Sequence, residues 1–300
     1  MKKPNLFIVG AAKAGTTTLW KYLKQHPNVY MPDDEISKEP SYFSTKFHKL
    51  DLNRYLELFS EAAESHKIIG EASTAYLTDP TSCQKIYEFN PESKIIIILR
   101  NPADRAYSLY NWMRQEGYEL ATSFEDALKK EKKRVEKKIP NFFESAFYWN
   151  YLYFNSGLYY EQVKRYVDGF GENVLVLTFE EFMLNQKAEM EKIYRFLGLE
   201  FIETSVSKEN ESLDIYSPYL QFIFRKLSKL VSDFKSVFVS KTTDKKRRDF
   251  LIYFGQKKIR PQRMSEITRK ILLEKYKADI IKLSDLTKMD FTSWLKTGIN

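Results

Sequence analysis

An apolar segment, a glycine-containing loop and a helix-forming segment follow one another near the start of the chain, and this order constrains the fold more than any other feature. Leu6–Val9 is apolar throughout, and Gly10–Gly15 holds two glycines and one lysine. Thr16–Gln25 then has apolar residues at helical spacing and ends before Pro27. A strand that enters a helix through such a loop is the first half of a βαβ unit. We therefore expect a first strand buried in a sheet.

The same alternation continues along the chain. Lys94–Leu99 ends in five consecutive apolar residues and is the clearest central strand, and Arg100 follows it directly, ahead of a helix predicted over 103–115. We also expect strands at 68–71 and 173–178 and helices at 82–90, 161–167, 180–197 and 267–286. Alternating strands and helices indicate a parallel sheet. The sequence therefore predicts an α/β, P-loop-like three-layer fold with a central, mostly parallel sheet flanked by helices and a helical C-terminal part.

The composition narrows the class of protein. Hydrophobic residues make up 43% and charged residues 29% of the 300 residues, which excludes wholesale disorder. One cysteine, Cys83, excludes an internal disulfide and a cysteine-cluster metal site. No segment approaches the ~18 apolar residues of a membrane span, and the apolar run near the start is shorter than a signal-peptide core. We therefore expect a cytoplasmic protein with a single domain over residues 1–300 and no membrane span.

The surplus of basic residues points to anionic ligands. Lys and Arg number 48 against 40 Asp and Glu, which gives a net charge of +8. Such a surplus fits nucleotide phosphates, acidic glycans, nucleic acid or a membrane surface, and it selects none of them. The densest run of charge, Lys129–Lys138, is typical of a solvated helix face or loop.

The first loop has the architecture of a phosphate-binding loop, because the N–H groups at a helix start can surround an anion. Its two glycines and Thr17 match the pattern GxxxxGK[ST], but the lysine lies inside the loop as Lys13, and Thr16 occupies its usual place. This displacement disfavours a nucleoside triphosphatase. Lys13 can still place positive charge beside one phosphate or sulfate. The alternative is a tight strand-to-helix turn with an exposed lysine.

A second anion site is predicted where the clearest strand ends. Arg100 lies at its carboxyl end, where open α/β sheets bind ligands. Ser108 follows about two helical turns later and can add a hydroxyl to the donors of the guanidinium. Arg105 lies nearby and could instead pair with an acid. The alternative is that Arg100 only closes a helix end.

With both motifs in place, the chain resembles the sulfotransferases that use 3′-phosphoadenosine 5′-phosphosulfate. Ile8–Leu19 resembles their 5′-phosphosulfate loop, and Leu99–Ser108 resembles their 3′-phosphate motif. Lys38–Phe43 resembles the segment that carries a glutamate base in the heparan-sulfate-type branch. Weaker similarities to that branch lie at Gly157–Tyr159, 174–179 and 290–295.

The resemblance implies a role for each motif. Lys13 would hold the 5′-phosphosulfate and stabilise charge on its bridging oxygen, and Glu39 would take the acceptor proton. Arg100 and Ser108 would hold the 3′-phosphate. The implied donor-binding residues are Lys13, Ala14, Gly15, Thr16, Thr17, Thr18, Arg100 and Ser108. The donor would be a co-substrate that leaves as 3′-phosphoadenosine 5′-phosphate, and the site would need no metal.

Several positions depart from the heparan-sulfate-type pattern. Ser41 stands where those enzymes often have histidine, and Ala72 stands where they have lysine, which weakens the inference of a heparan-like acceptor. Glu71 could act as the base instead of Glu39. The cytosolic branch of the family uses a histidine base. The three histidines of this chain are scattered and are expected to be structural or on the surface: His26, His48 and His66.

The resemblance leaves the acceptor open. We expect a hydroxyl or an amine of a carbohydrate or another small metabolite, bound among residues 120–150 and 205–260, which depart most from the shared core. Nucleic acid is not expected as a partner, and the sequence does not predict the oligomeric state. One alternative function is a P-loop kinase or triphosphatase, although the lysine after the second glycine is missing. The other is a non-catalytic module for an anionic polymer, which would explain the charge but not the ordered motifs.

Overall fold

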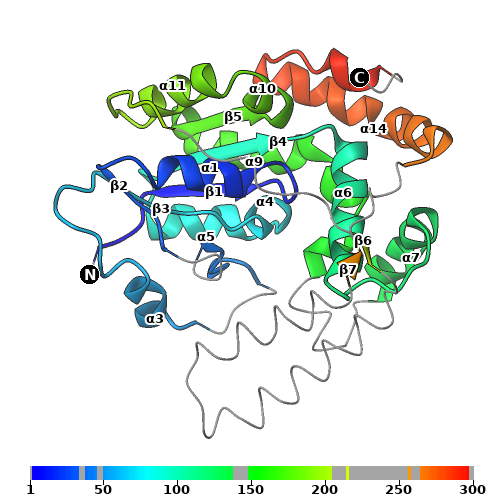
Figure 1. Cartoon of the computed structure of the whole chain (residues 1–300), viewed down its shortest axis with the longest axis horizontal. Helices are drawn as coiled ribbons and strands as arrows, with labels where there is room; N and C mark the ends of the chain where they lie inside the picture. The colour runs from blue at the N-terminus through cyan, green and yellow to red at the C-terminus, as the bar shows by residue number, and fades with distance from the viewer. Residues whose placement is uncertain are drawn as a thin grey trace, which may run out of the picture.

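A sheet of five parallel strands forms the centre of the computed structural model, which describes residues 2–33, 38–45, 50–137, 148–204, 214–215, 256–257 and 264–296 (Figure 1). The strands are β1 (Leu6–Gly10), β2 (Val29–Tyr30), β3 (Ile68–Glu71), β4 (Lys94–Leu99) and β5 (Val174–Thr178). Their spatial order is β2-β3-β1-β4-β5, and each neighbouring pair is parallel. All five residues of β1 and the last five of β4 are buried, which explains their continuous apolar sequence.

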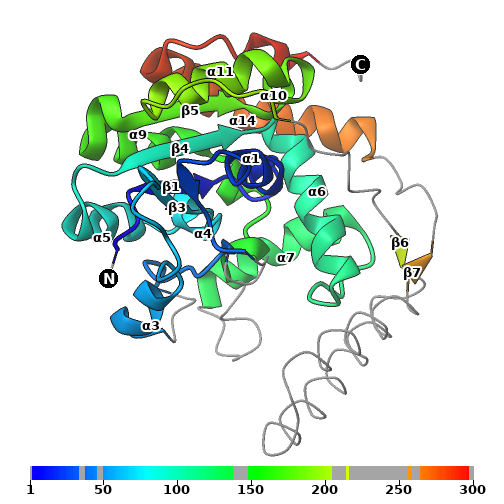
Figure 2. The ribbon, with the colours of Figure 1, turned by 60° about the vertical axis from the view of Figure 1, so that its left-hand side comes forward.

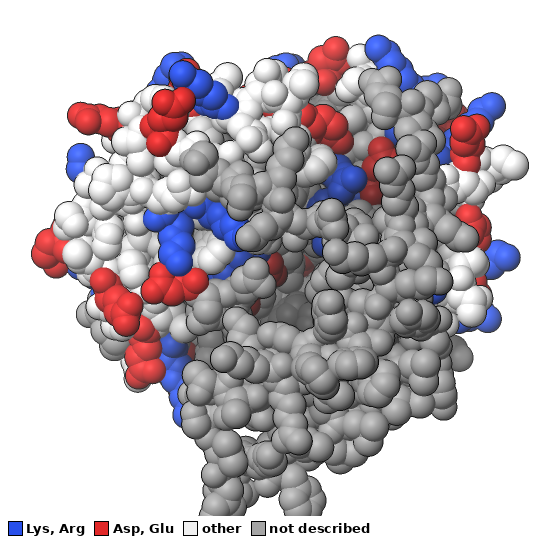
Figure 3. Space-filling view, in the orientation of Figure 1, with Lys and Arg blue, Asp and Glu red and all other residues white. Residues whose placement is uncertain are grey.

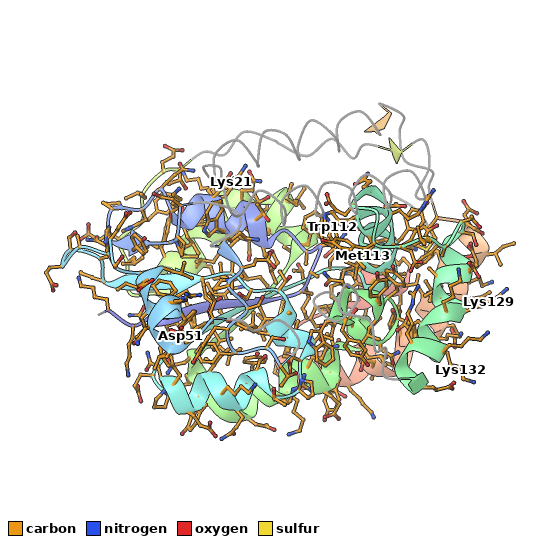
Figure 4. The ribbon with its side chains drawn as sticks, turned by 90° about the horizontal axis from the view of Figure 1, so that it is seen from below. Lys21, Asp51, Trp112, Met113, Lys129 and Lys132 are labelled. Carbon is orange, nitrogen blue, oxygen red and sulfur yellow. The ribbon has the colours of Figure 1, made fainter. Side chains whose placement is uncertain are left out.

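Helices cover both faces of this sheet and continue beyond it. They are α1 (Thr16–Leu23), α3 (Leu52–Glu57), α4 (Ala75–Thr78), α5 (Ser82–Phe89), α6 (Pro102–Gln115), α7 (Phe124–Lys137), α9 (Tyr159–Phe170), α10 (Phe179–Leu184), α11 (Gln186–Phe196) and α14 (Glu266–Thr287). Seen along the sheet, α1 lies on one side and α5 on the other (Figure 4). The three-layer α/β fold predicted from the sequence is confirmed.

Side-chain contacts connect the helices within each outer layer. On the face of α1, the Tyr22 hydroxyl donates to Gln186 Oε1 of α11 at 2.9 Å. On the opposite face, α5 and α9 meet where the Cys83 thiol donates to the Arg165 carbonyl, with a sulfur–oxygen distance of 3.2 Å. The Tyr166 hydroxyl of α9 donates to the Tyr76 carbonyl of α4 at 2.9 Å. These contacts hold each helical layer as a unit against the buried strands.

The C-terminal part is helical, as predicted, and packs on the helices that follow β4. Arg269 of α14 donates through Nε and Nη2 to the two carboxylate oxygens of Asp104 in α6, both at 3.1 Å. After α14, a short 3₁₀ turn at Thr292–Leu295 brings the Trp294 carbonyl to the Asn101 amide, with an N–O distance of 3.0 Å. The last helix therefore supports the start of α6.

Two local predictions need correction or completion. The single helix predicted over 180–197 is wrong, because the backbone of Asn185 leaves the helical region and divides it into α10 and α11. The charge run Lys129–Lys137 belongs to the helix α7, and Lys129 and Lys132 lie on its outer side (Figure 4). Glu131 faces inward: it is 2% exposed and accepts from the backbone N–H groups of Phe154 and Asn155. The charge run is therefore solvated on one side only.

Of the expected acceptor segments, 120–150 is described except for 138–147, and 205–260 lies outside the described residues except for 214–215 and 256–257. Within the second segment, β6 (Asp214–Ile215) and β7 (Gln256–Lys257) form an antiparallel pair apart from the central sheet (Figure 2). Among the described helices, none combines the length and the apolar composition needed to cross a membrane.

Candidate active site

The predicted anion-binding residues meet where the strand order changes direction. From β1 the chain leads to β2 at one edge of the sheet, and β3 returns beside β1, whereas β4 and β5 extend the sheet on the other side. Loops that leave the carboxyl ends of β1 and β4 therefore diverge here, and open α/β sheets bind ligands at such a point. The loop after β1 is held against β4 because the Ala11 N–H donates to the Ile98 carbonyl at 2.7 Å.

The loop after β1 requires both of its glycines. Gly10 has φ +149°, and a Cβ there would lie 2.8 Å from the Cβ of Leu77. Gly15 has φ +91° and is the N-cap residue of α1, where a Cβ would lie 3.0 Å from the ring of Phe179. No side chain caps α1, and its first turn holds no acidic residue. The N–H groups of that turn are thus left for an anion.

The predicted donor-binding residues divide into those that offer N–H groups and those that do not. The Ala14 N–H is used within the loop, since it donates to the Ala11 carbonyl at 3.2 Å. Thr16, Thr17 and Thr18 form the first turn of α1, where helical N–H groups have no partner in the helix. The Ala14 N–H is therefore used inside the loop, whereas the three threonines carry the N–H groups at the start of α1.

Two cations lie side by side at this junction. The Arg100 guanidinium donates through Nη1 to the Lys13 carbonyl at 3.2 Å and lies 4.7 Å from the centroid of the Phe179 ring. The Lys13 ammonium lies 5.8 Å from the centroid of the Trp112 ring on α6. Burial and the neighbouring charge of Arg100 lower the pKa of Lys13 from 10.5 to about 8. Two cations close together repel each other, and a bound anion would stabilise the charged form of both.

Residues around Arg100 fix the start of α6. The Tyr159 hydroxyl donates to the Arg100 carbonyl at 2.9 Å, and the Asn101 side chain caps the helix by accepting from the N–H groups of its first turn. Ser108 is half-buried in the second turn of α6, as the predicted spacing requires. Arg105 is 1% exposed and donates to the Tyr153 carbonyl at 2.7 Å. It therefore belongs to the core rather than to the anion site.

Glu39 lies beside the same loop and is held at both carboxylate oxygens. The Lys38 ammonium donates to Glu39 Oε1 at 2.8 Å and to Thr17 Oγ1 at 3.0 Å. The Thr74 hydroxyl donates to Glu39 Oε2 at 3.1 Å. The Glu39 side chain keeps 37% of its surface exposed, whereas that of Lys38 keeps 4%. A half-exposed carboxylate next to a cationic loop can accept a proton from a bound molecule.

Glu71, the alternative base, has a different environment. It is fully buried and accepts hydrogen bonds from the hydroxyls of Tyr55 at 2.6 Å, Tyr76 at 3.0 Å and Ser73. Burial raises the pKa of Glu71 from 4.5 to about 7, although these hydroxyls oppose the shift. Both carboxylates accept hydrogen bonds at both oxygens, but Glu71 has no exposed surface whereas Glu39 keeps 37% of its side-chain surface exposed, so this geometry favours Glu39 for proton transfer with a bound molecule.

Histidines and metal ligands contribute nothing to this junction in the described part of the chain. His26 is 2% exposed and bonds the Glu200 carbonyl at 3.0 Å, and His66 Nδ1 accepts from the Ala63 N–H at 2.8 Å. His48 lies outside the described residues. Among the described side chains, no group of three or more His, Cys, Asp or Glu could hold a metal ion.

The sequence prediction missed several residues that shape the site. Lys38 entered the sequence analysis only as the first residue of the segment Lys38–Phe43, and its bond to Thr17 had no sequence signal. Phe179 and Trp112, which contact Arg100 and Lys13, were seen only as members of apolar or helical segments. On the face shown in Figure 3, Lys and Arg side chains gather beside a hollow in the surface.

Comparisons with known proteins identify the family to which this fold belongs. The model of the sulfotransferase domain matches residues 3–252. The human bifunctional heparan sulfate N-deacetylase/N-sulfotransferase 2 is 25% identical over 209 residues, which cover 65% of this chain and 22% of that protein. Mouse carbohydrate sulfotransferase 15 is 26% identical over 268 residues, with coverages of 72% and 46%. This chain thus spans less than half the length of these curated relatives.

A solved structure extends the likeness to the whole fold. The crystal structure of a sulfotransferase from Alicyclobacillus acidocaldarius aligns with 99% of this chain and 100% of its own, with a TM-score of 0.71 and 28% identity. The chain belongs to the sulfotransferase family.

Proposed function

We propose that this sulfotransferase moves a sulfuryl group from 3′-phosphoadenosine 5′-phosphosulfate to a hydroxyl or amine of a carbohydrate or another small metabolite. The observation that carries the proposal is the contact between Lys13 and Arg100, which sets two cations at the carboxyl ends of β1 and β4. One cation suits the 5′-phosphosulfate and the other suits the 3′-phosphate. The carbohydrate acceptor is supported by the names of the relatives, one of which is a carbohydrate sulfotransferase.

The loop residues fit a phosphosulfate group. The uncapped first turn of α1 offers N–H donors, and Gly15 leaves open the space that a Cβ would take beside Phe179. The proposed donor-binding set remains Lys13, Ala14, Gly15, Thr16, Thr17, Thr18, Arg100 and Ser108, with Ala14 acting through the shape of the loop. Bound there, the donor supplies the sulfuryl group, and 3′-phosphoadenosine 5′-phosphate leaves when its S–O bond breaks.

Two side chains would carry the chemistry. Glu39 would accept the proton of the acceptor while the acceptor oxygen or nitrogen forms its bond to sulfur. Lys13 would stabilise the negative charge that develops on the bridging oxygen as the S–O bond breaks. The proton thus passes to Glu39, and the electron pair stays with the departing nucleotide. The positive charge comes from Lys13, Arg100 and the helix N–H groups, so this route uses no metal.

The test of the donor assignment is the 3′-phosphate dependence of binding in Arg100→Ala. Calorimetric titration should show affinity for 3′-phosphoadenosine 5′-phosphate reduced by roughly 10–150-fold, since a charged hydrogen bond contributes about 1.5–3 kcal/mol. Affinity for adenosine 5′-phosphosulfate, which lacks the 3′-phosphate, should change little. Equal losses for both ligands would contradict the assignment of Arg100.

A charge-matched control separates this contact from a general loss of positive charge. Lys129 is exposed on the outer side of α7 (Figure 4), so Lys129→Ala removes one positive charge far from the sheet ends. Its affinities for both nucleotides should equal those of the unmodified protein. Tighter binding of ATP than of 3′-phosphoadenosine 5′-phosphate by the unmodified protein would instead favour a kinase or triphosphatase.

A further inference from the structure

Lys38 joins the proposed base to the proposed donor loop. Its ammonium lies 2.8 Å from Glu39 Oε1 and 3.0 Å from Thr17 Oγ1, and the residue is 3% exposed. Its backbone is fixed as well, because the Ala72 N–H at the end of β3 donates to the Lys38 carbonyl at 3.0 Å. Lys38 is thus held at its backbone by the sheet and at its ammonium by the first turn of α1.

The buried ammonium of Lys38 pairs with the carboxylate of Glu39, which is half-exposed. An ion pair that served only the core would bury its carboxylate, as the pair of Arg134 with the 2%-exposed side chain of Glu119 does elsewhere in the molecule. Glu39 keeps 37% of its side-chain surface exposed while Lys38 fixes one oxygen and Thr74 the other. The carboxylate is therefore restrained in direction and still accessible to a bound molecule.

We propose that Lys38 is a positioning residue, which aligns the Glu39 carboxylate with the donor held at the first turn of α1. This inference rests on the proposed function, because alignment matters only if Glu39 acts on an acceptor beside the donor. Misplacing a reacting group by about 1 Å can cost about 10²-fold in rate. Without Lys38, Glu39 loses its link to Thr17, and among the described residues the hydroxyl of Thr74 remains as its donor.

A double-mutant cycle of Lys38→Met and Glu39→Gln tests this role. We expect Lys38→Met to lower kcat by about 10–100-fold while the Kd of 3′-phosphoadenosine 5′-phosphate changes by less than about threefold. In the Glu39→Gln background, adding Lys38→Met should lower kcat by less than about threefold, because residues that act as one unit are not additive. An equal loss of kcat in both backgrounds would overturn the proposal, as would a large loss of nucleotide affinity.

Further variants keep the test decisive. Lys38→Arg retains the charge and should recover part of kcat relative to Lys38→Met. Lys38→Gln, which removes the charge, replaces Lys38→Met in the cycle if that variant does not fold. Lys24→Met is the matched control, because Lys24 also lies at an end of α1 and pairs with a carboxylate, Asp33, at 2.8 Å. It should leave kcat and Kd unchanged. A kcat reduced as much in Lys24→Met as in Lys38→Met would overturn the proposal.

The outcome also separates this inference from the function on which it rests. If the unmodified protein transfers no sulfuryl group to any acceptor, the proposed function fails. If the unmodified protein is active and Lys38→Met has the same kcat, the function stands and the positioning role fails. Circular dichroism melts of each variant show whether a loss of activity reflects loss of the fold.

Discussion

Glu39 and Glu71 are neighbouring carboxylates in opposite surroundings. Glu39 is half-exposed and bonded by the ammonium of Lys38, next to the cationic loop that carries Lys13. Glu71 is fully buried and bonded only by neutral hydroxyls, from two tyrosines and Ser73. The same type of side chain thus stands in two different settings. A charged, accessible setting suits proton transfer with a ligand, whereas a neutral, closed setting organises the core.

On the Glu39 side of this comparison, we expect the largest loss of activity from removing the Lys13 ammonium. Lys13→Ala should lower kcat by on the order of 10²-fold or more, as the loss of one oxyanion-type donor does. Nucleotide affinity should fall less, because the helix N–H groups and Arg100 remain. Initial rates with saturating donor, together with calorimetric Kd values, separate the two effects. An unchanged kcat in a folded variant would contradict the role of Lys13.

The surroundings of Glu71 can be tested through the pH dependence of the free energy of unfolding. Since the pKa of Glu71 is raised from 4.5 to about 7, the folded protein binds a proton in this pH range that the unfolded chain has released. The stability that this group contributes is full below about pH 4.5 and is lost as the pH rises through about 7. Glu71→Gln should therefore gain about 2–3 kcal/mol of unfolding free energy relative to the unmodified protein between pH 5 and pH 8.

Urea unfolding at the two pH values measures this difference. Glu92→Gln is the control, because Glu92 is exposed, and its unfolding free energy should follow that of the unmodified protein at both pH values. If the difference in unfolding free energy between Glu71→Gln and the unmodified protein stays constant from pH 5 to pH 8, the buried carboxyl group titrates normally and this prediction fails.

The smallest effects should come from removing one hydroxyl that bonds Glu39 and one that bonds Glu71. Thr74→Val removes the donor to Glu39 Oε2 and should lower kcat by about 3–10-fold, the equivalent of one ordinary hydrogen bond, with little change in stability. Ser73→Ala removes a donor to Glu71 and the acceptor of the Ser41 N–H, so it should lower the unfolding free energy by about 1–3 kcal/mol and leave kcat nearly unchanged. Steady-state kinetics and urea unfolding of both variants measure these effects. A loss of kcat in Ser73→Ala together with a loss of stability in Thr74→Val would contradict the prediction.

The parts of the fold and site that could be predicted from the sequence are those encoded locally. The strands β1 and β4 contain continuous apolar runs, Arg100 directly follows β4, and Lys13 lies in the short loop between β1 and α1. Once the strands are known to be parallel, their carboxyl ends must meet, so the meeting of the two cations follows from the topology. The fold class was predictable for the same reason.

Contacts between elements that lie apart in the sequence could not be predicted in this way. Lys38 reaches Thr17 across 21 residues, and nothing in the residue spacing around either position indicates the contact. The hydroxyls on Glu71 come from Tyr55, Ser73 and Tyr76, which lie on different elements and look like ordinary core or loop residues. The preference for Glu39 over Glu71 therefore rests on burial and hydrogen bonding, which the sequence does not indicate.

The most direct test of the account compares Glu39→Gln with Glu71→Gln in sulfuryl transfer. With radiolabelled 3′-phosphoadenosine 5′-phosphosulfate and a panel of carbohydrate acceptors, Glu39→Gln should lose about 10²–10⁴ of the rate, the usual contribution of a general base. Its affinity for 3′-phosphoadenosine 5′-phosphate should stay constant, and Glu71→Gln should retain the rate of the unmodified protein within about threefold. An inactive but folded Glu71→Gln beside an active Glu39→Gln would contradict the account.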